Sequence, residues 1–270
     1  MTRYRLDPTW RRPGDGRVVI AGSPLRLFRL SAGGAHVIAQ VEAGTPPPGA
    51  PVAQLLDRFV EAGALHPEHP AGPFTAADVT VVVPAHDRLP VAWPPGVREV
   101  VVVDDASPGV PLEARPGPSG AGPQAGGLGV IDSAHISWIR HDTNRGPGAA
   151  RNTGLAEVRT PVVAFVDTDV ELPEGWLEPL LAHFADARVA LVAPRVASGG
   201  AAVRPGEAVR PGGVARYEAR RSPLDLGTEP ARIVAGSRVS YVPAAVVVCR
   251  TEVVRAAGGF DEGLRFGEDV

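Results

Sequence analysis

The chain contains no lysine, one cysteine and one methionine among its 270 residues. All 27 basic residues are therefore arginines, so any side-chain cation that meets a phosphate is a planar guanidinium. Cys249 has no second cysteine to pair with, which excludes an intrachain disulfide and favours a reducing, cytoplasmic compartment. No apolar run approaches the roughly 18 residues of a membrane helix, and the first residues lack the apolar core of a signal peptide. The net charge of −3 disfavours a nucleic-acid partner.

Residues 1–70 have the pattern of a small α+β module. Two strand-like runs, 17–20 and 25–30, flank a Gly-Ser-Pro turn signal, and helical patterns follow over 32–41 and 52–62. Ser31 is placed to cap the first helix. The order of hairpin, helix and helix predicts a winged-helix-like plan.

A Pro-rich connection is expected next, from His66 to Pro73, with a linker over 71–78 between two domains. The spacing of His66 and His69 suggests a metal site, but the flanking prolines exclude a helix that would bring both onto one face.

From Val79 onward the pattern changes to short Val-rich runs separated by helical segments. Such continuous apolar runs are typical of strands buried on both faces of a mainly parallel sheet. Helices are expected over 147–158 and 173–186, each with a proline at its start. Residues 79–270 therefore predict an α/β domain. The strand runs are 79–84, 99–104, 136–140, 162–166 and 189–192.

Acidic side chains follow two of these runs. Asp167 and Asp169 end the run 162–166, where paired carboxylates can bind Mg²⁺ or Mn²⁺ together with substrate phosphates. Asp104 and Asp105 end the run 99–104 and can accept hydrogen bonds from a ligand base or ribose. Both pairs also fit plain turns, because Asp is common after strands. Ligands bind beyond the carboxyl ends of the strands in open parallel sheets, so we expect these residues to share one edge.

The stretch 141–154 is rich in glycine and opens a helix after a strand. Its backbone N–H groups can meet an anion, and Arg145 and Arg151 can pair with phosphate oxygens. It matches neither the Walker loop nor the dinucleotide-binding Gly pattern. The alternative is an ordinary loop with solvated arginines.

Six short motifs in this order resemble glycosyltransferase family 2, and together they cover residues 79–270. The resemblance implies a GT-A fold, with flanking helices around a mainly parallel sheet, and a hexosyltransferase that uses a nucleotide-sugar donor and a divalent metal with inversion at the anomeric carbon. The motifs are Val-Val-Val-Pro-Ala-His-Asp-Arg (81–88), Val-Val-Val-Asp-Asp-Ala-Ser (101–107), Asn-Arg-Gly-Pro-Gly-Ala-Ala-Arg-Asn-Thr-Gly-Leu (144–155), Val-Asp-Thr-Asp (166–169), Gly-Gly-Phe-Asp-Glu (258–262) and Gly-Glu-Asp-Val (267–270).

The resemblance also implies roles for single residues. Ala85 and Asp105 match positions that hold the donor base, and Arg151 matches a basic residue at the diphosphate or base. Asp167 matches a neighbour of the ribose or diphosphate, and Asp169 matches the metal ligand. Asp269 matches the general base that takes the proton of the acceptor hydroxyl.

The module over 1–70 resembles the PqqD-type peptide-recognition domains, and its combination with family 2 motifs resembles the mycofactocin-system transferases. This implies glucose transfer from UDP-glucose to a peptide-derived redox cofactor or its precursor peptide. Strand addition at a sheet edge is the expected mode of peptide binding. A capping or dimerisation module is the alternative. A cell-envelope transferase acting on polysaccharide or lipid, and a non-catalytic peptide or nucleotide binder, are the competing functions.

The sequence departs from the family pattern in three places. The connection 85–98 is short and contains three prolines, and 106–129 holds seven glycines and five prolines where a helix is usual. Both flank the expected donor-base pocket. The chain also ends one residue after Asp269, so we expect a C-terminally incomplete transferase domain, with any membrane segment lying beyond residue 270.

Overall fold

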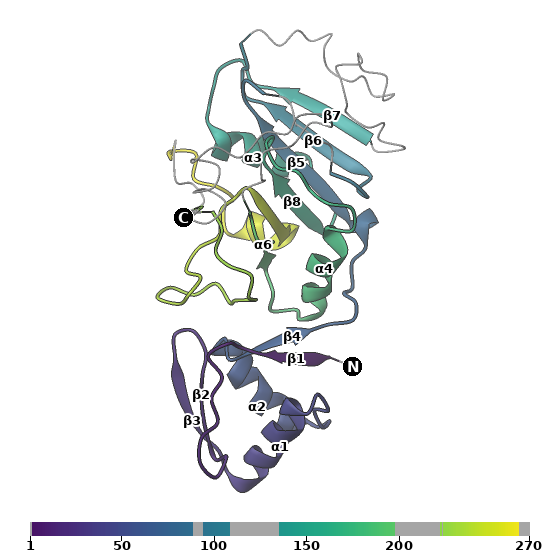
Figure 1. Ribbon diagram of the computed structural model, residues 1–270. Coiled ribbons are helices and arrows are strands. Elements are labelled where there is room, and N and C mark those ends of the chain that lie inside the picture. Colours follow the sequence, from purple (N-terminus) through teal and green to yellow (C-terminus); the bar gives the residue numbers. More distant parts are fainter. Residues whose placement is uncertain (1, 89–93, 109–134, 198–221, 223, 265–270) are drawn as a thin grey trace, which may run out of the picture. The chain divides into compact units, whose positions relative to one another are not determined.

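The computed structural model describes residues 2–88, 94–108, 135–197, 222 and 224–264, which form two compact units (Figure 1). The first unit groups 1–70 with 197–242, and the second groups 71–196 with 243–270. The first unit thus includes a stretch that lies, in sequence, inside the second. In the part of the chain that is described, no helix is long and apolar enough to cross a membrane.

The described residues of the first unit form two helices and two antiparallel strand pairs. Strand β2 (Val18–Ala21) pairs with β3 (Arg26–Arg29), and β1 (Arg3–Leu6) pairs with β4 (Leu65–Glu68). Helix α1 (Ala32–Glu42) begins after Ser31, whose side-chain oxygen accepts a hydrogen bond from Gly34 N–H, and α2 is Ala50–Glu61. The predicted hairpin, helices and Ser31 cap are confirmed.

An aromatic cluster forms the core of this unit. Phe59 of α2 is fully buried, with its ring stacked on Phe28 at 4.2 Å and tilted against Trp10 at 5.6 Å. Trp10 also donates its indole N–H to Glu42. Buried aromatic rings contribute a large share of core stability.

The connection expected from His66 to Pro73 begins inside a strand, which corrects that prediction. Pro67 lies opposite Tyr4 in a two-stranded pair, where every residue is on an edge strand and a missing N–H can be tolerated. His66 is buried and bonds to Asp7 at 3.0 Å, so it serves the core of this unit.

Asp7 joins three segments of the first unit. Its buried carboxylate accepts hydrogen bonds from the N–H and hydroxyl of Thr9, from His66 and from Arg238, which lies in the stretch that the second half of the chain contributes. Burial opposes its ionisation, but these hydrogen bonds outweigh that effect and lower the pKa of Asp7 to about 2.

The second unit is built on a six-stranded sheet with the order β7-β6-β5-β8-β10-β9. The first four strands in this order are parallel, and β10 is antiparallel to both of its neighbours. A 3₁₀ turn, η1 (Ala76–Asp78), precedes the sheet. The strands are β5 (Val79–Ala85), β6 (Glu99–Asp104), β7 (His135–Arg140), β8 (Val162–Val166), β9 (Leu191–Val192) and β10 (Val246–Arg250). The α/β prediction with a mainly parallel sheet is confirmed.

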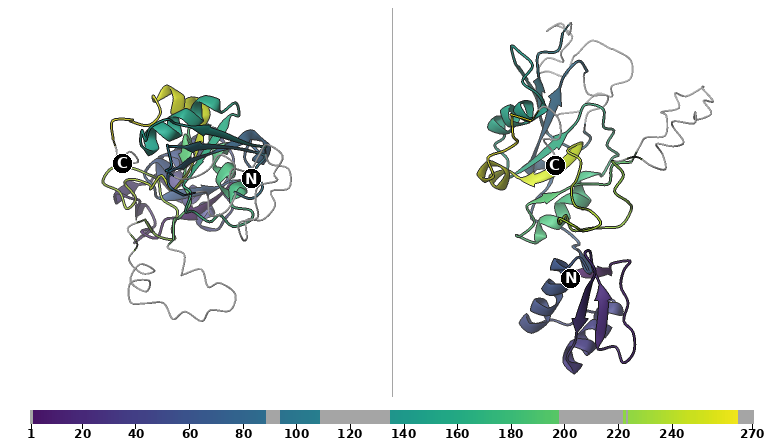
Figure 2. Two further views of the ribbon diagram at one scale, coloured as in Figure 1. Left: turned by 90° about the horizontal axis from the view of Figure 1, so that it is seen from above. Right: turned by 90° about the vertical axis from the view of Figure 1, so that its left-hand side faces the viewer.

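Helices cover both faces of this sheet (Figures 1 and 2). Helix α4 (Leu177–Ala182) and the 3₁₀ turn η3 (His183–Ala185) pack on the face presented by Val81, Val83 and Val100. Helix α3 (Pro147–Glu157) covers the other face, and α6 (Thr251–Ala256) lies beside its C-terminus, where Arg255 donates to two α3-end carbonyls.

Two elements of this unit differ from expectation. The helix expected from Pro173 begins only at Leu177, because Pro173 opens a turn in which its carbonyl accepts Trp176 N–H and Gly175 adopts a φ of +73°. The run ending at Cys249 is strand β10, inserted between β8 and β9. Burial raises the pKa of the Cys249 thiol to about 12, which makes this thiol an unreactive core group.

The chain order of the strands reverses next to β5. From β5 the chain moves outward through β6 to β7 and then returns to place β8 on the other side of β5. Such a reversal opens a crevice beyond the carboxyl ends of the strands, where ligands bind in open α/β sheets. Polar residues follow β5, β6 and β8 at this edge, as expected.

Gly154 permits α3 to lie close against the sheet. A Cβ there would overlap Val82 Cγ1 and press on Val103. We expect Gly154→Ala to lower the free energy of unfolding by roughly 1–3 kcal/mol, measured by urea denaturation, because helix and strands must separate.

Gly33→Ala in α1 is the matched control, since no atom lies within 4 Å of the Cβ it would add. It should leave stability unchanged or raise it by about 0.4–1 kcal/mol. A Gly154→Ala protein as stable as the wild type would contradict the close packing.

Candidate functional site at the carboxyl edge of the sheet

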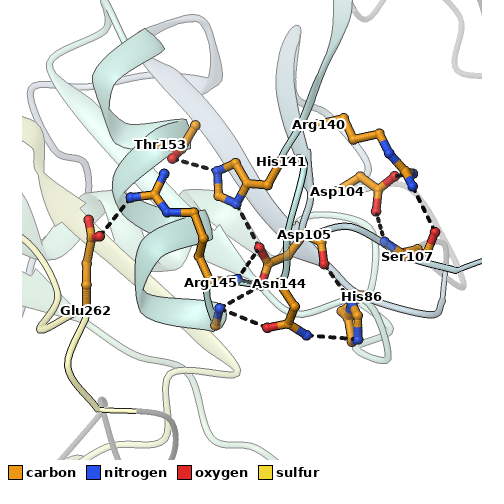
Figure 3. A network of polar contacts seen from close by, with 11 residues as sticks. His86, Asp104, Asp105, Ser107, Arg140, His141, Asn144, Arg145, Thr153 and Glu262 are labelled. Carbon is orange, nitrogen blue, oxygen red and sulfur yellow. Dashed lines mark hydrogen bonds and ion pairs between the residues drawn. The ribbon is translucent and has the colours of Figure 1, made fainter.

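Asp105 is the hub of a polar network beyond β5 and β6 (Figure 3). Its carboxylate, which is almost fully buried, accepts hydrogen bonds from the backbone N–H of Arg145 and, at 2.7 Å, from that of Gly146. These N–H groups belong to the Gly-rich stretch just before α3, so Asp105 holds the start of that helix against the end of β6. Carboxylates favour this position because the helix start carries partial positive charge.

His141 adds a further contact to Asp105 and links it to α3. Its Nδ1 lies 2.7 Å from Asp105 Oδ1, and its Nε2 lies 2.9 Å from the hydroxyl of Thr153. Because the carboxylate can only accept, Nδ1 carries a proton and donates it to Asp105, while Nε2 shares a hydrogen bond with the Thr153 hydroxyl. The hydrogen bonds from Thr153 through His141 therefore orient the Asp105 carboxylate.

Asp104 stabilises the loop after β6. Its carboxylate accepts hydrogen bonds from Ser107 N–H and from Arg140 (Figure 3). Burial opposes its ionisation, but the Ser107 hydrogen bonds and the charge of Arg140 together lower the pKa of Asp104. For Asp104, the contact with Ser107 matches the turn-forming reading of this Asp pair.

The loops after β5 and β6 are bonded to each other through His86 and Asp87. His86 Nδ1 donates to the carbonyl of Asp105 at 2.7 Å, so its Nε2 can accept from Asn144 at 3.0 Å. Asp87 N–H donates to the Ser107 hydroxyl. Among the described residues, the non-glycine residues with left-handed backbone are Asp87 and Ala106, and such strain gathers at functional sites.

His86 is a site residue that the sequence reasoning did not nominate. Its side chain is 39% exposed at the carboxyl edge of the sheet. Its position directly after a buried strand was the available signal. Ala85, which was nominated, ends β5 with a buried side chain, and its carbonyl accepts Asp105 N–H. Its contribution to the site is therefore made by the backbone.

Arg151 pairs with Asp167 across the space between α3 and β8. Its guanidinium donates to Asp167 Oδ1 at 2.8 Å, and only 3% of its side chain is exposed. The side chain expected at the donor diphosphate or base thus has its described contacts inside the protein. Asp167 is one-third exposed and lies between this buried cation and the open edge.

Asp169 differs from the other carboxylates of the edge. It is exposed, and none of the described residues donates a hydrogen bond to it or forms an ion pair with it. In the described part of the chain, no group of three or more His, Cys, Asp or Glu side chains is placed to hold a metal by itself. An exposed carboxylate of this kind fits Mg²⁺ or Mn²⁺, which usually shares its coordination with water and substrate phosphates. Asp269 lies outside the described residues.

The loop 259–262 is bonded to α3. Asn152 donates to Glu262 and to the carbonyl of Phe260. Arg145 forms an exposed ion pair with Glu262 at 2.9 Å (Figure 3). The hydrogen bond from Asn152 and the charge of Arg145 lower the pKa of Glu262 despite slight burial. Arg145 therefore contacts both Asp105, through its backbone, and this loop, through its side chain.

Comparison with known proteins identifies relatives of the chain. Residues 91–224 match the family model for glycosyl transferase family 2. Pre-mycofactocin glycosyltransferases from two strains of Mycobacterium tuberculosis are 40% identical over 273 aligned residues, which include 98% of this chain. The chain spans about half (52%) of the length of these relatives.

Solved structures give weaker similarities. Residues 1–349 of S. aureus TarS align with 71% of the chain and 52% of that structure, at 22% identity and a TM-score of 0.45. The mannosyltransferase PcManGT of Pyrobaculum calidifontis, solved with GDP-Man and Mn²⁺, aligns with 75% of the chain and 52% of that structure, at 20% identity and a TM-score of 0.42. These scores are too low to carry an argument about ligands.

Asp105→Asn tests the hub directly. Both oxygens of the Asp105 carboxylate accept hydrogen bonds, so the NH₂ group of an asparagine would face a donor in either orientation. We therefore expect a loss of roughly 1–3 kcal/mol in the free energy of unfolding, measured in urea. Asp142→Asn, an exposed neighbour in the same loop, is the control and should change stability by less than about 0.5 kcal/mol. Equal effects of the two substitutions would show that Asp105 is not the hub.

Proposed function

The chain carries a glycosyl transferase family 2 domain, and we propose that it moves a sugar from a nucleotide-sugar donor to an acceptor hydroxyl with the help of a divalent metal. The observation that carries the proposal is the carboxyl edge of the sheet. There the strand order reverses, and Asp169 is exposed two residues after Asp167, which pairs with Arg151.

The donor is proposed to bind with its diphosphate near Asp167 and Asp169. When bound, Mg²⁺ or Mn²⁺ would neutralise charge that develops on the departing diphosphate, with Asp169 as its protein ligand. Asp167 is already paired with Arg151, so its charge is partly compensated and it is suited to accept hydrogen bonds from the ribose or from water. His86 offers an exposed ring face for the donor base, beside the loop that Asp105 holds.

Asp269 is proposed as the general base. A carboxylate within hydrogen-bond reach of the acceptor would take the hydroxyl proton while the oxygen attacks the anomeric carbon opposite the leaving diphosphate. Such in-line attack inverts that carbon. The proton ends on the carboxylate, and the leaving diphosphate keeps the bonding electron pair.

A peptide-derived redox cofactor precursor is the proposed acceptor, with glucose from UDP-glucose as the transferred group. The 40% identity to the pre-mycofactocin glycosyltransferases supports this choice. The first unit supports it too, because β3 pairs only with β2 among the described strands and so has a free edge. Leu25 and Leu27, on either side of Arg26 at the start of β3, are 61% and 62% exposed, which suits strand addition by an acidic or apolar peptide.

Asp169→Asn should weaken binding of UDP in the presence of Mn²⁺ by about tenfold or more, measured by calorimetry, because the amide is a poorer ligand for a hard cation. Binding of UDP without metal should change little. Asp142→Asn, which also removes one exposed carboxylate, is the control and should bind as the wild type does. Equal Mn²⁺-dependent binding by all three proteins would contradict the assignment of Asp169.

Asp269→Asn should lower turnover roughly 10²–10⁴-fold while UDP binding survives, because only proton removal is lost. Mass spectrometry of the peptide-derived acceptor after incubation with UDP-glucose gives the rate. Unchanged turnover would remove Asp269 from the mechanism. Transfer to glycans or lipids alone would replace the proposed acceptor with a cell-envelope one.

A further inference from the structure

The side-chain amide of Asn152 in α3 bonds to both the backbone N–H and the backbone carbonyl of Phe260. Its Oδ1 accepts Phe260 N–H at 2.9 Å, and its Nδ2 donates to the Phe260 carbonyl at 2.8 Å. Two residues of an antiparallel sheet exchange hydrogen bonds in the same way, so the side-chain amide takes the place of a neighbouring strand. We refer to this arrangement as the Asn152–Phe260 amide pair.

Two glycines permit this close contact. Gly259 has a φ of +76°, and a Cβ there would overlap Asn152 Oδ1. A Cβ on Gly148, one turn earlier on α3, would lie 3.1 Å from the carbonyl oxygen of Asp261. The absence of a side chain at these two glycines allows the loop to approach α3 closely at two points, and this close packing fixes the position of Phe260.

The Phe260 ring packs against the guanidinium of Arg151. Its ring centroid lies 5.3 Å from the centre of the Arg151 guanidinium, and the ring meets Phe165 of β8 edge-on at 4.9 Å. The guanidinium therefore has an aromatic ring on one side while it donates to Asp167 at 2.8 Å. Arginine is a flexible side chain, and contacts of this kind restrict it to one orientation.

We propose that Asn152 and Phe260 are positioning residues for Asp167: the amide pair fixes the Phe260 ring, the ring orients Arg151, and Arg151 holds the Asp167 carboxylate at the donor edge. The proposal deepens the proposed function, on which the donor-binding role of Asp167 rests. Arg151, Phe165 and Phe260 come from α3, β8 and the loop after α6, and Arg151 alone of these three is bonded to Asp167. A change in the loop therefore reaches the donor edge through Arg151, without touching the donor.

Phe260→Leu tests the proposal against a matched control, Phe184→Leu. Phe184 is fully buried and Phe260 half-buried, and the two pack on opposite faces of the same sheet. Phe184 also lies beside a guanidinium, that of Arg250, at 5.2 Å. Phe260→Leu should weaken Mn²⁺-dependent UDP binding about three- to tenfold, whereas Phe184→Leu should leave it within about twofold. Urea unfolding of both variants reports the general loss of stability. Equal weakening by the two substitutions, or none by either, would overturn the proposal.

Two further variants separate positioning from simple packing. Phe260→Tyr keeps the ring over Arg151 and should restore binding to within about twofold of the wild type. Asn152→Asp keeps the size of the side chain but cannot donate to the Phe260 carbonyl, and it should weaken binding as Phe260→Leu does. If binding survived Phe260→Leu but was lost in Phe260→Tyr, this result would contradict a role for the ring.

A double-mutant cycle with Asp167→Asn decides whether Phe260 acts through Asp167. In the Asp167→Asn background, Phe260→Leu should cause no additional loss of UDP binding, and independent, multiplicative losses would overturn the proposal. If the wild type does not bind UDP with Mn²⁺, the proposed function fails. The free energies of unfolding of the same single and double variants, measured in urea, then test whether Phe260 and Asp167 are coupled. Coupled residues give non-additive changes in this free energy, and independent residues give additive ones.

Discussion

The carboxyl edge of the sheet depends on the buried carboxylate of Asp105. It receives two backbone N–H groups from the start of α3 and the imidazole of His141, and its own backbone bonds to Ala85 and His86 after β5. Three chain segments that are far apart in sequence therefore meet at one residue. A buried charge is tolerated only when its hydrogen-bonding capacity is filled, as it is here. Without this residue, the loops after β5 and β6 and the start of α3 would have no common anchor.

The acidic and basic groups of the edge divide into two sets with different tasks. Asp104, Asp105 and Arg151 are occupied by hydrogen bonds or ion pairs within the protein, so they shape loops and orient neighbours. Asp169 and the side chain of His86 are exposed. Asp105 holds His86 through its backbone carbonyl, and buried supporting contacts of this kind give precision to an exposed site.

Much of the second unit could be predicted from the sequence because Val-rich runs bounded by polar residues have few alternatives to buried parallel strands. The edge location of the Asp clusters follows from the same pattern. The burial of Arg151 could not be predicted, since a Gly-rich loop with arginines looks the same whether the guanidinium meets phosphate or a carboxylate of the next strand. Strands β1 and β4 were missed because their pairing joins residues some 60 positions apart, and Pro67 reads as a linker.

The central claim is that the edge holds a metal and a nucleotide diphosphate between Asp167 and Asp169. The most direct measurement is a crystal structure of the protein with UDP and Mn²⁺, with the metal located by its anomalous scattering. The account predicts an anomalous peak bonded to the Asp169 carboxylate and to diphosphate oxygens, with the base beside His86. A peak away from Asp169, or UDP bound elsewhere on the protein, would contradict it.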